Sequence, residues 1–305
     1  MGYSGSLSTG ALAAGGTLGI LIPPSVILII YSILTEQNIA KMFLAAFVPG
    51  ILAAIGYLIA IAIFVRIKPD SGPPTSYVGW RQRLSLFGQV WQILVIFFLV
   101  IGGIYLGWFT PTEGASIGAA GTGIMALFTK GFNFNDLIEV IKDTAVTSAM
   151  IFLVLLGAEF FNSFIALTQI TNQLATFVIT NQLSPYLVVF CILVLYVFLG
   201  CLMDSLAMIL LTIPVFFPII IELDFGMSIE EVAIWFGILT LIVVEVGLIT
   251  PPVGLNVFII NKMAKNVPIS DTFIGVLPFL ISDLIRVGIL FIFPGISLFL
   301  IRLLG

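Results

Sequence analysis

Long apolar stretches joined by short polar links fill almost the whole of this 305-residue chain. Two of them, residues 93–106 and 185–202, contain no charged side chain at all. About 20 apolar residues in a helix match the roughly 30 Å hydrocarbon layer of a bilayer, whereas a soluble domain needs a polar surface. With 60% hydrophobic and only 9% charged residues, the sequence predicts an all-α, polytopic integral membrane protein.

Charge and residue usage exclude several classes of function. The formal charge is −4, and the 11 basic residues sit mainly at the ends of apolar runs, so nothing favours nucleic-acid binding. The absence of histidine removes the usual general base and the commonest metal ligand, and Asp204 has no second aspartate in a Gly-x-Gly-Asp setting, so we predict no enzyme and no cofactor. Cys191 and Cys201 lie in one apolar run and are interpreted as small hydrophobes.

A sequence segment with a double proline occurs twice. Gly-Ile-Leu-Ile-Pro-Pro at 19–24 aligns with Gly-Leu-Ile-Thr-Pro-Pro at 247–252, at an offset of 247 − 19 = 228. Each copy continues with an apolar stretch, a polar link and a proline, Pro49 or Pro278, before another long apolar segment. Because proline lacks an amide donor and clashes with the preceding turn, both copies predict a broken helix inside an internal repeat.

The two polar links differ in charge. The first carries Glu36 with Lys41, and the second carries Lys262 and Lys265. If lysine marks the cytoplasmic side, the two copies are inverted relative to one another. The stretch 66–83, with four basic residues against one acid, is likewise predicted to be a cytoplasmic loop. Inverted repeats with helices broken at matching positions are typical of secondary transporters, whose sites lie near the bilayer midplane.

Each break is also a candidate binding site. Backbone groups released from a helix cannot stay bare in hydrocarbon and must be buried, wetted or bound to a ligand. Sodium favours hard oxygen ligands, and Thr250 and Asn256 with nearby carbonyls are the predicted sodium ligands in the second copy. Ser25 and the carbonyls around Gly19 are their counterparts in the first. The alternative is that the prolines only kink helices for packing.

For several ionisable residues the sequence leaves two alternatives open, a binding role and a structural role. Asp204 lies at membrane depth, where it either binds an ion or substrate or caps a helix together with Ser205. Glu113 either steadies a helix start or contributes to the binding cage. Glu245 either binds a cation or pairs within the bundle.

Asp283 and Arg286 are three residues apart, on one helical face. This spacing predicts a local ion pair. The alternative is that Arg286 binds a substrate carboxylate.

Three motifs resemble one family. They are Gly-Gly-Thr-Leu-Gly-Ile-Leu-Ile-Pro-Pro-Ser at 15–25, Tyr-Leu-Gly-Trp-Phe-Thr-Pro-Thr-Glu-Gly-Ala at 105–115, and the segment 247–256. In this order they resemble the large membrane subunit of TRAP (tripartite ATP-independent periplasmic) transporters over essentially the whole chain. The resemblance implies a sodium-driven importer of organic acids such as C4-dicarboxylates or sialic acid, in the bacterial inner membrane. It also implies a small membrane subunit and a periplasmic substrate-binding protein as partners.

The family further implies an elevator mechanism and two re-entrant hairpins, the second of which would begin near Asp204. Its counterpart 228 positions earlier would precede residue 1, so we expect the chain to comprise about the C-terminal two thirds of the subunit. An ion channel, or a structural subunit without transport, is the alternative function. The predicted ion- and substrate-binding residues are Gly19, Pro23, Pro24, Ser25, Thr112, Glu113, Asp204, Ser205, Gly247, Thr250, Pro251, Gly254 and Asn256.

We predict four regions. Residues 1–65 form the C-terminal part of the first repeat, and residues 66–84 form the cytoplasmic loop. Residues 85–183 form central helices, with a short amphipathic connection at 136–142, an apolar stretch at 144–166 and a polar patch that begins at 168 and runs to 184. Residues 184–305 form the second repeat with its hairpin, broken helix and terminal helix. In this repeat we expect a short, broken element after Asp204, a capping box at Ser228 and Glu231 that opens the next helix, and a last long apolar segment over 271–302.

Overall fold

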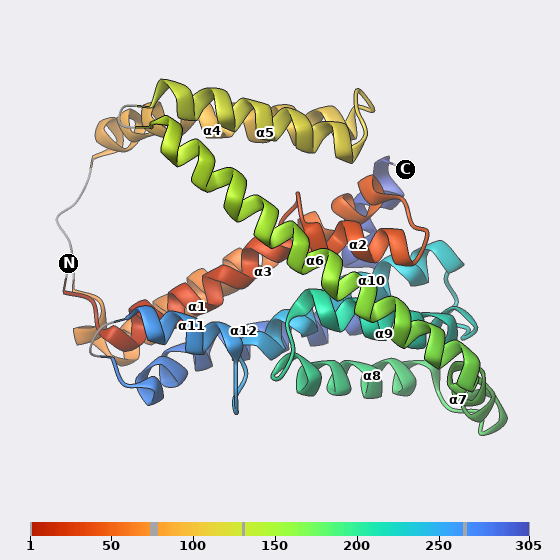
Figure 1. Ribbon diagram of the computed structural model, residues 1–305. Coiled ribbons are helices and arrows are strands. Elements are labelled where there is room, and N and C mark those ends of the chain that lie inside the picture. Colours follow the sequence, from red (N-terminus) through yellow and green to blue (C-terminus); the bar gives the residue numbers. More distant parts are fainter. Residues whose placement is uncertain (1, 74–78, 130–131, 265–266, 305) are drawn as a thin grey trace. The chain divides into compact units, whose positions relative to one another are not determined.

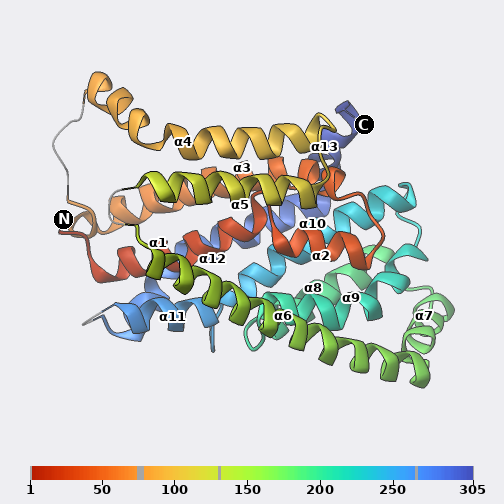
Figure 2. The same ribbon diagram turned by 45° about the horizontal axis from the view of Figure 1, so that its top comes forward.

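The computed structural model describes residues 2–73, 79–129, 132–264 and 267–304, without the side chains at 82, 83, 86, 87 and 89 (Figures 1 and 2). In these ranges all regular structure is helical, which confirms the predicted all-α fold. The helices are α1 (Gly5–Leu21), α2 (Val26–Leu34), α3 (Ile39–Ile67), the 3-10 turn η1 (Pro69–Ser71), α4 (Trp80–Tyr105), α5 (Pro111–Phe128), α6 (Phe134–Thr168), α7 (Ile170–Thr180), α8 (Pro185–Gly200), α9 (Ser205–Ile221), α10 (Ile229–Ile249), α11 (Leu255–Met263), α12 (Ile269–Ile292) and α13 (Gly295–Leu304).

The chain forms two compact units. The first unit contains residues 1–73 and 157–305, and the second contains residues 74–156. In the second unit α4 and α5 form an antiparallel pair, with Ile104 beside Gly114 and Ile96 beside Gly121. The four regions predicted from sequence divide the chain differently, and their boundaries stay predictions.

Four described helices, α3, α6, α10 and α12, are both long enough and apolar enough to cross a membrane. The pair α1 and α2 is long and apolar enough when taken together, with a bend of 43° at its break. α8, α9, α13 and residues 90–105 of α4 are shorter apolar helices. These lengths and compositions confirm a polytopic membrane protein.

Two segments are more continuous than the sequence indicated. The predicted amphipathic connection 136–142 and the apolar stretch 144–166 form the single 35-residue helix α6. Its start is fixed by reciprocal bonds, because Asp136 accepts from the Asn133 amide at 2.8 Å and Asn133 accepts from the Asp136 amide at 3.1 Å. No proline interrupts it afterwards. The polar patch 168–184, expected between helices, contains α7.

The predicted short, broken element after Asp204 is instead the continuous helix α9, which holds Pro214 and Pro218 in its interior. Pro214 has no amide hydrogen, so it cannot donate a hydrogen bond to the Leu210 carbonyl four residues earlier in the helix. The side-chain amide of Asn162 on α6 lies 3.5 Å from that carbonyl and replaces the missing donor. The last apolar segment, 271–302, is likewise two helices, α12 and α13, separated just before Pro294.

α10 lies at the centre of the first unit. Its side chains from Val232 to Ile249 are all buried, and the capping box predicted at Ser228 and Glu231 is present. Ile249 belongs to a core cluster with Val276 and Phe279 of α12. This buried helix carries the second double-proline break at its end.

Contacts fix the direction of α1 relative to α12. The Ser6 hydroxyl donates to the Asp271 carbonyl at 2.7 Å, and four residues further along each helix Gly10 lies against the backbone of Gly275. Both contacts advance in the same sense. α1 and α12 are therefore parallel.

α3 runs the opposite way. The Thr17 and Tyr57 hydroxyls are 3.1 Å apart, whereas Ile22, later in α1, lies beside Gly50, earlier in α3. α3 is thus antiparallel to α1 and to α12. Because α3 and α12 occupy matching places in the two repeats, their opposite directions agree with the predicted inversion.

The same relation holds for α10 and α12. The Trp235 indole near the start of α10 donates to the Leu290 carbonyl near the end of α12 at 2.9 Å, while Ile249 at the end of α10 shares a core cluster with Phe279 in the middle of α12. α10 is therefore antiparallel to α12, and so to its repeat counterpart α1.

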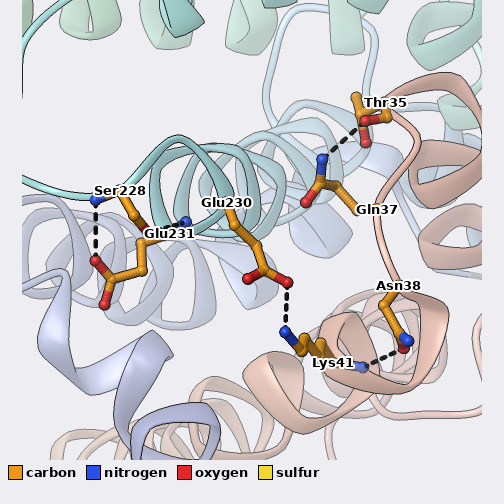
Figure 3. Close-up of polar contacts among 7 residues, drawn as sticks. All are labelled: Thr35, Gln37, Asn38, Lys41, Ser228, Glu230 and Glu231. Atoms are coloured by element: carbon orange, nitrogen blue, oxygen red, sulfur yellow. Dashed lines mark hydrogen bonds and ion pairs between the residues drawn. The ribbon is translucent and has the colours of Figure 1, made fainter. Parts of the chain in front are cut away.

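The two polar links consequently lie at opposite ends of the first unit. At one end the starts of α3 and α10 meet, and Lys41 Nζ binds Glu230 Oε1 at 2.6 Å. Figure 3 shows these two side chains pointing toward each other, near the helix caps Asn38 and Ser228. At the other end the link between α11 and α12 lies beside the start of α1, because the Val267 side chain lies next to Gly5.

Candidate functional site

Both predicted helix breaks are present. α1 ends at Leu21 and α2 begins at Val26, while α10 ends at Ile249 and α11 begins at Leu255. The peptide bonds Pro23–Pro24 and Pro251–Pro252 are both cis. The second break turns through Gly254, whose φ of +60° is readily adopted by glycine.

Each break releases carbonyl groups from its helix. In a continuous helix the amide of residue i donates to the carbonyl of residue i−4, and proline has no amide hydrogen. Pro23 and Pro24 therefore leave Gly19 and Ile20 without these donors. In the second copy the Gly247 carbonyl is recovered by the Thr250 amide at 3.0 Å, and the Leu248 carbonyl loses its helical donor. The two breaks present oxygens at repeat-matched positions.

Next to the second break lies a helical hairpin formed by α8 and α9, which run side by side in both ribbon views (Figures 1 and 2). The Thr212 hydroxyl donates to the Tyr196 hydroxyl at 2.7 Å, and the turn at 201–204 joins the helices. With 16 and 17 residues, both helices are apolar but shorter than the membrane-spanning helices of this chain. The hairpin predicted to begin near Asp204 thus begins at Pro185, and Asp204 lies at its tip.

The hairpin tip packs directly on the broken helix. The backbones of Gly200 and Gly247 approach so closely that a Cβ on Gly247 would lie 2.6 Å from the Gly200 Cα atom. Beside this contact, the Cys201 thiol lies 3.8 Å from the Pro251 carbonyl oxygen. Only glycine permits the close approach, because any side chain there would overlap backbone atoms.

Of the two predicted residues Asp204 and Ser205, Asp204 caps α9. The Asp204 carboxylate accepts from the Leu206 amide at 3.0 Å and remains exposed, whereas Ser205 is buried. Asp204 therefore fulfils the capping alternative. The cap also holds its carboxylate at the tip that contacts the break.

The predicted sodium ligands flank the second break. The Thr250 hydroxyl donates to the Val246 carbonyl at 2.5 Å, which leaves its oxygen lone pairs available. Asn256 lies in the first turn of α11, and a Cβ on Gly16 of α1 would be 4.0 Å from its side-chain nitrogen. Residues of α1, α10 and α11 thus meet around this break.

The first break has different neighbours. Ser25 is buried and caps α2 by accepting from the Leu28 amide at 3.3 Å. α2 packs on the second arm of the hairpin, where the rings of Tyr31 and Phe217 are 6.4 Å apart. Of the predicted residues here, Pro23 is buried and Gly19 and Pro24 are exposed.

Thr112 and Glu113 belong to the second unit. The Glu113 carboxylate accepts from the Thr110 amide at 2.7 Å, and the Thr110 hydroxyl accepts from the Glu113 amide at 3.3 Å, which completes a capping box at the start of α5. The hydrogen bonds from Thr110 hold the pKa of Glu113 below its usual range. Glu113 therefore stabilises the start of α5, which is the structural alternative given for it above.

The predicted pair between Asp283 and Arg286 is confirmed at 2.9 Å, with both side chains almost fully buried. The sequence did not indicate its partners. Tyr57 donates to the second oxygen of Asp283 at 2.7 Å, and the Thr17 hydroxyl adjoins Tyr57. Tyr57 in the apolar stretch 50–65 of α3 was the available signal, and only the packing of α1, α3 and α12 brings these residues together.

Glu245 is buried on α10, and its carboxylate has no hydrogen-bond partner among the described groups. Among the described residues, no group therefore makes the pairing expected for Glu245 through a hydrogen bond.

These features define a polytopic helical membrane protein with antiparallel repeats, each broken by a double proline, and a short hairpin docked on one break. The model of the DctM component of the tripartite ATP-independent periplasmic transporters matches residues 1–296. The chain belongs to this family.

The chain is similar to relatives whose names give different substrates. It is 32% identical over 305 residues to the C4-dicarboxylate TRAP transporter large permease protein DctM of Pseudomonas aeruginosa, covering 100% of this chain and 69% of the relative. It is 34% identical over 309 residues to the sialic acid TRAP transporter permease protein SiaT of Haemophilus influenzae, covering 99% and 48%. It is 29% identical over 302 residues to the ectoine TRAP transporter large permease protein TeaC of Halomonas elongata, covering 98% and 68%.

Proposed function

We propose that this chain is the permease subunit of a sodium-coupled secondary transporter that imports organic acids across the bacterial inner membrane. It would receive its substrate from a periplasmic binding protein and work with a small membrane subunit. Family membership and the relatives' names support a carboxylate-bearing substrate, because C4-dicarboxylates and sialic acid carry carboxylates. The observation that carries the proposal is the hairpin tip seated on the second helix break.

A cation fits the oxygen-rich side of this contact. The Leu248 carbonyl lacks its helical donor, and Thr250 and Asn256 place side-chain oxygens on either side of the break. Sodium would be bound by these oxygens. The starts of α9 and α11 adjoin the same region, and helix N-termini favour anions, so a substrate carboxylate would lie next to the ion.

The ends of the first unit suggest its orientation. Arg66 and Lys68 close α3 and Lys262 closes α11, at the end where α1 and α12 begin. By the positive-inside rule this end faces the cytoplasm. The hairpin base lies at the opposite end, because Tyr186 contacts Trp235 near the start of α10. The hairpin would therefore enter from the periplasmic side and move with α10 and α11 as an elevator.

Removing the proposed sodium ligands is expected to weaken sodium dependence. In the complete transporter in proteoliposomes, Thr250→Val keeps the branched shape without the hydroxyl, and Asn256→Ala removes the amide. Each is expected to raise the sodium concentration for half-maximal uptake about tenfold, the equivalent of one lost contact of about 1.4 kcal/mol. Uptake of succinate and of sialic acid is measured against sodium concentration.

Two variants serve as controls for this experiment. Thr250→Ser retains the hydroxyl and is expected to keep the normal sodium dependence. Asn261→Ala removes a side chain on the same helix that binds the Val267 carbonyl and Thr272 instead of lining the break. An unchanged sodium requirement in both Thr250→Val and Asn256→Ala would refute the assigned ligands, and non-saturable conductance would indicate a channel.

A further inference from the structure

A second polar cluster lies within the unbroken parts of α1, α3, α10 and α12. It consists of Glu245 on α10, Asp283 and Arg286 on α12, Tyr57 on α3 and Thr17 on α1. The three charged side chains are 95% or more buried. Trp235 and Ile249 of α10 lie against Leu290 and near Phe279 of α12, and Glu245 falls between the first two residues as Asp283 and Arg286 fall between the last two. The three charged side chains therefore lie on facing stretches of α10 and α12.

The charges in this cluster do not balance. Two carboxylates face a single guanidinium, so the fully ionised cluster would carry one net negative charge in a buried site. An uncompensated buried charge is strongly unfavourable, and the usual outcome is that the group takes up a proton or pairs with a cation. One further positive charge is therefore required.

The contacts identify where that charge resides. Asp283 Oδ1 lies 2.9 Å from the Arg286 guanidinium as an ion pair, and Asp283 Oδ2 accepts from the Tyr57 hydroxyl at 2.7 Å. A neighbouring cation and a hydrogen-bond donor both favour an ionised carboxylate. Glu245 receives no donor from the described groups, and both its oxygens are fully buried. Glu245 is thus the carboxylate for which the neutral form is favoured.

A metal ion fits this position poorly. Sodium needs several oxygen ligands, whereas Glu245 lies within the unbroken part of α10, where the backbone carbonyls are used by the helix. The Arg286 guanidinium in the same cluster would also repel a metal cation. A proton needs neither a ligand cage nor a break in the helix.

The remaining titratable groups on helices packed against α10 have other partners or positions. Tyr31 on α2 donates to the Ala233 carbonyl, near the start of α10, and Tyr196 on α8 accepts from Thr212. On α13, Arg302 binds Glu231.

Four further groups have other contacts or lie elsewhere. Tyr186 on α8 adjoins Trp235, and the Cys201 thiol donates to the Val197 carbonyl at 3.1 Å. Cys191 on α8 is exposed. Lys262 lies in the last turn of α11, at the far end from the break.

The repeat gives this site a distinctive position. Glu245 matches Thr17 at the offset 245 − 228 = 17, so the two residues occupy equivalent places, each five residues before its break. We propose that Glu245 is a proton-binding site between the two inverted repeats, separate from the cation site at the break. The proposal does not depend on the transported substrate or on sodium coupling.

Infrared difference spectroscopy tests the proposal on the complete transporter in lipid nanodiscs at neutral pH. The wild-type protein is expected to show the C=O stretch of a neutral carboxylic acid, shifted in deuterated buffer. Glu245→Gln is expected to lose this absorption. Glu230→Gln, which alters an exposed carboxylate on the same helix, is expected to retain it.

Thermal unfolding provides a second readout. Because glutamine matches the neutral acid in shape, Glu245→Gln is expected to fold and to melt within error of the wild type. Failure of this variant to fold, or persistence of the absorption in it, would overturn the proposal. Loss of the wild-type absorption when sodium replaces choline would also overturn it, by indicating a metal site.

Discussion

Gly247→Ala is expected to reduce substrate uptake by about 100-fold, the scale of loss that misplacement of a site by about 1 Å produces. The added Cβ would lie 2.6 Å from the Gly200 Cα atom and 2.7 Å from its carbonyl carbon. Both are backbone atoms, so no side-chain rotation relieves the overlap. The hairpin tip must move away from the break, and the proposed site opens.

Uptake into proteoliposomes measures this effect, with Gly288→Ala as the matched control. A Cβ at Gly288 on α12 meets no described atom within 4 Å, so that variant is expected to transport normally. Equal uptake by the two variants would mean that the tip need not touch the break during transport.

Arg286→Met is expected to lower the free energy of unfolding by about 3–5 kcal/mol, because it leaves Asp283 buried without its cation. Methionine keeps much of the side-chain volume, so loss of charge rather than a cavity dominates. The exposed pair between Lys41 and Glu230 supplies the comparison. Lys41→Met is expected to cost less than about 1 kcal/mol, as surface ion pairs do.

Thermal or denaturant unfolding of the purified complex distinguishes these cases. The double variant Asp283→Leu with Arg286→Met removes both charges and is expected to recover part of the lost stability. If Arg286→Met is no less stable than Lys41→Met, the buried pair between Asp283 and Arg286 contributes no more to the free energy of unfolding than an exposed pair does.

The sequence predicted the helix breaks because proline acts locally. Pro23 and Pro251 lack amide hydrogens wherever the chain packs, so the interruption and its repetition were readable from spacing alone. The capping box at the start of α10 is equally local. The predicted inversion rested on two lysines in one link, and the contacts between α1, α3, α10 and α12 agree with it.

What escaped prediction depends on contacts between distant residues. The position of the hairpin tip is marked by the close backbone contact between Gly200 and Gly247, and no local sequence pattern indicates this contact. In α9, the Asn162 side chain donates to the Leu210 carbonyl, which Pro214 leaves without its helical donor. The bond from Tyr57 to Asp283 joins residues 226 positions apart.

Alkylation of Cys201 tests most directly whether sodium binds where the hairpin tip meets the broken helix. This thiol is buried against Pro251, whereas Cys191 is exposed and is replaced in Cys191→Ser. With a sodium site at the break, sodium but not potassium slows labelling of Cys201, and Thr250→Val abolishes that protection. Identical labelling rates with and without sodium would contradict the proposed site.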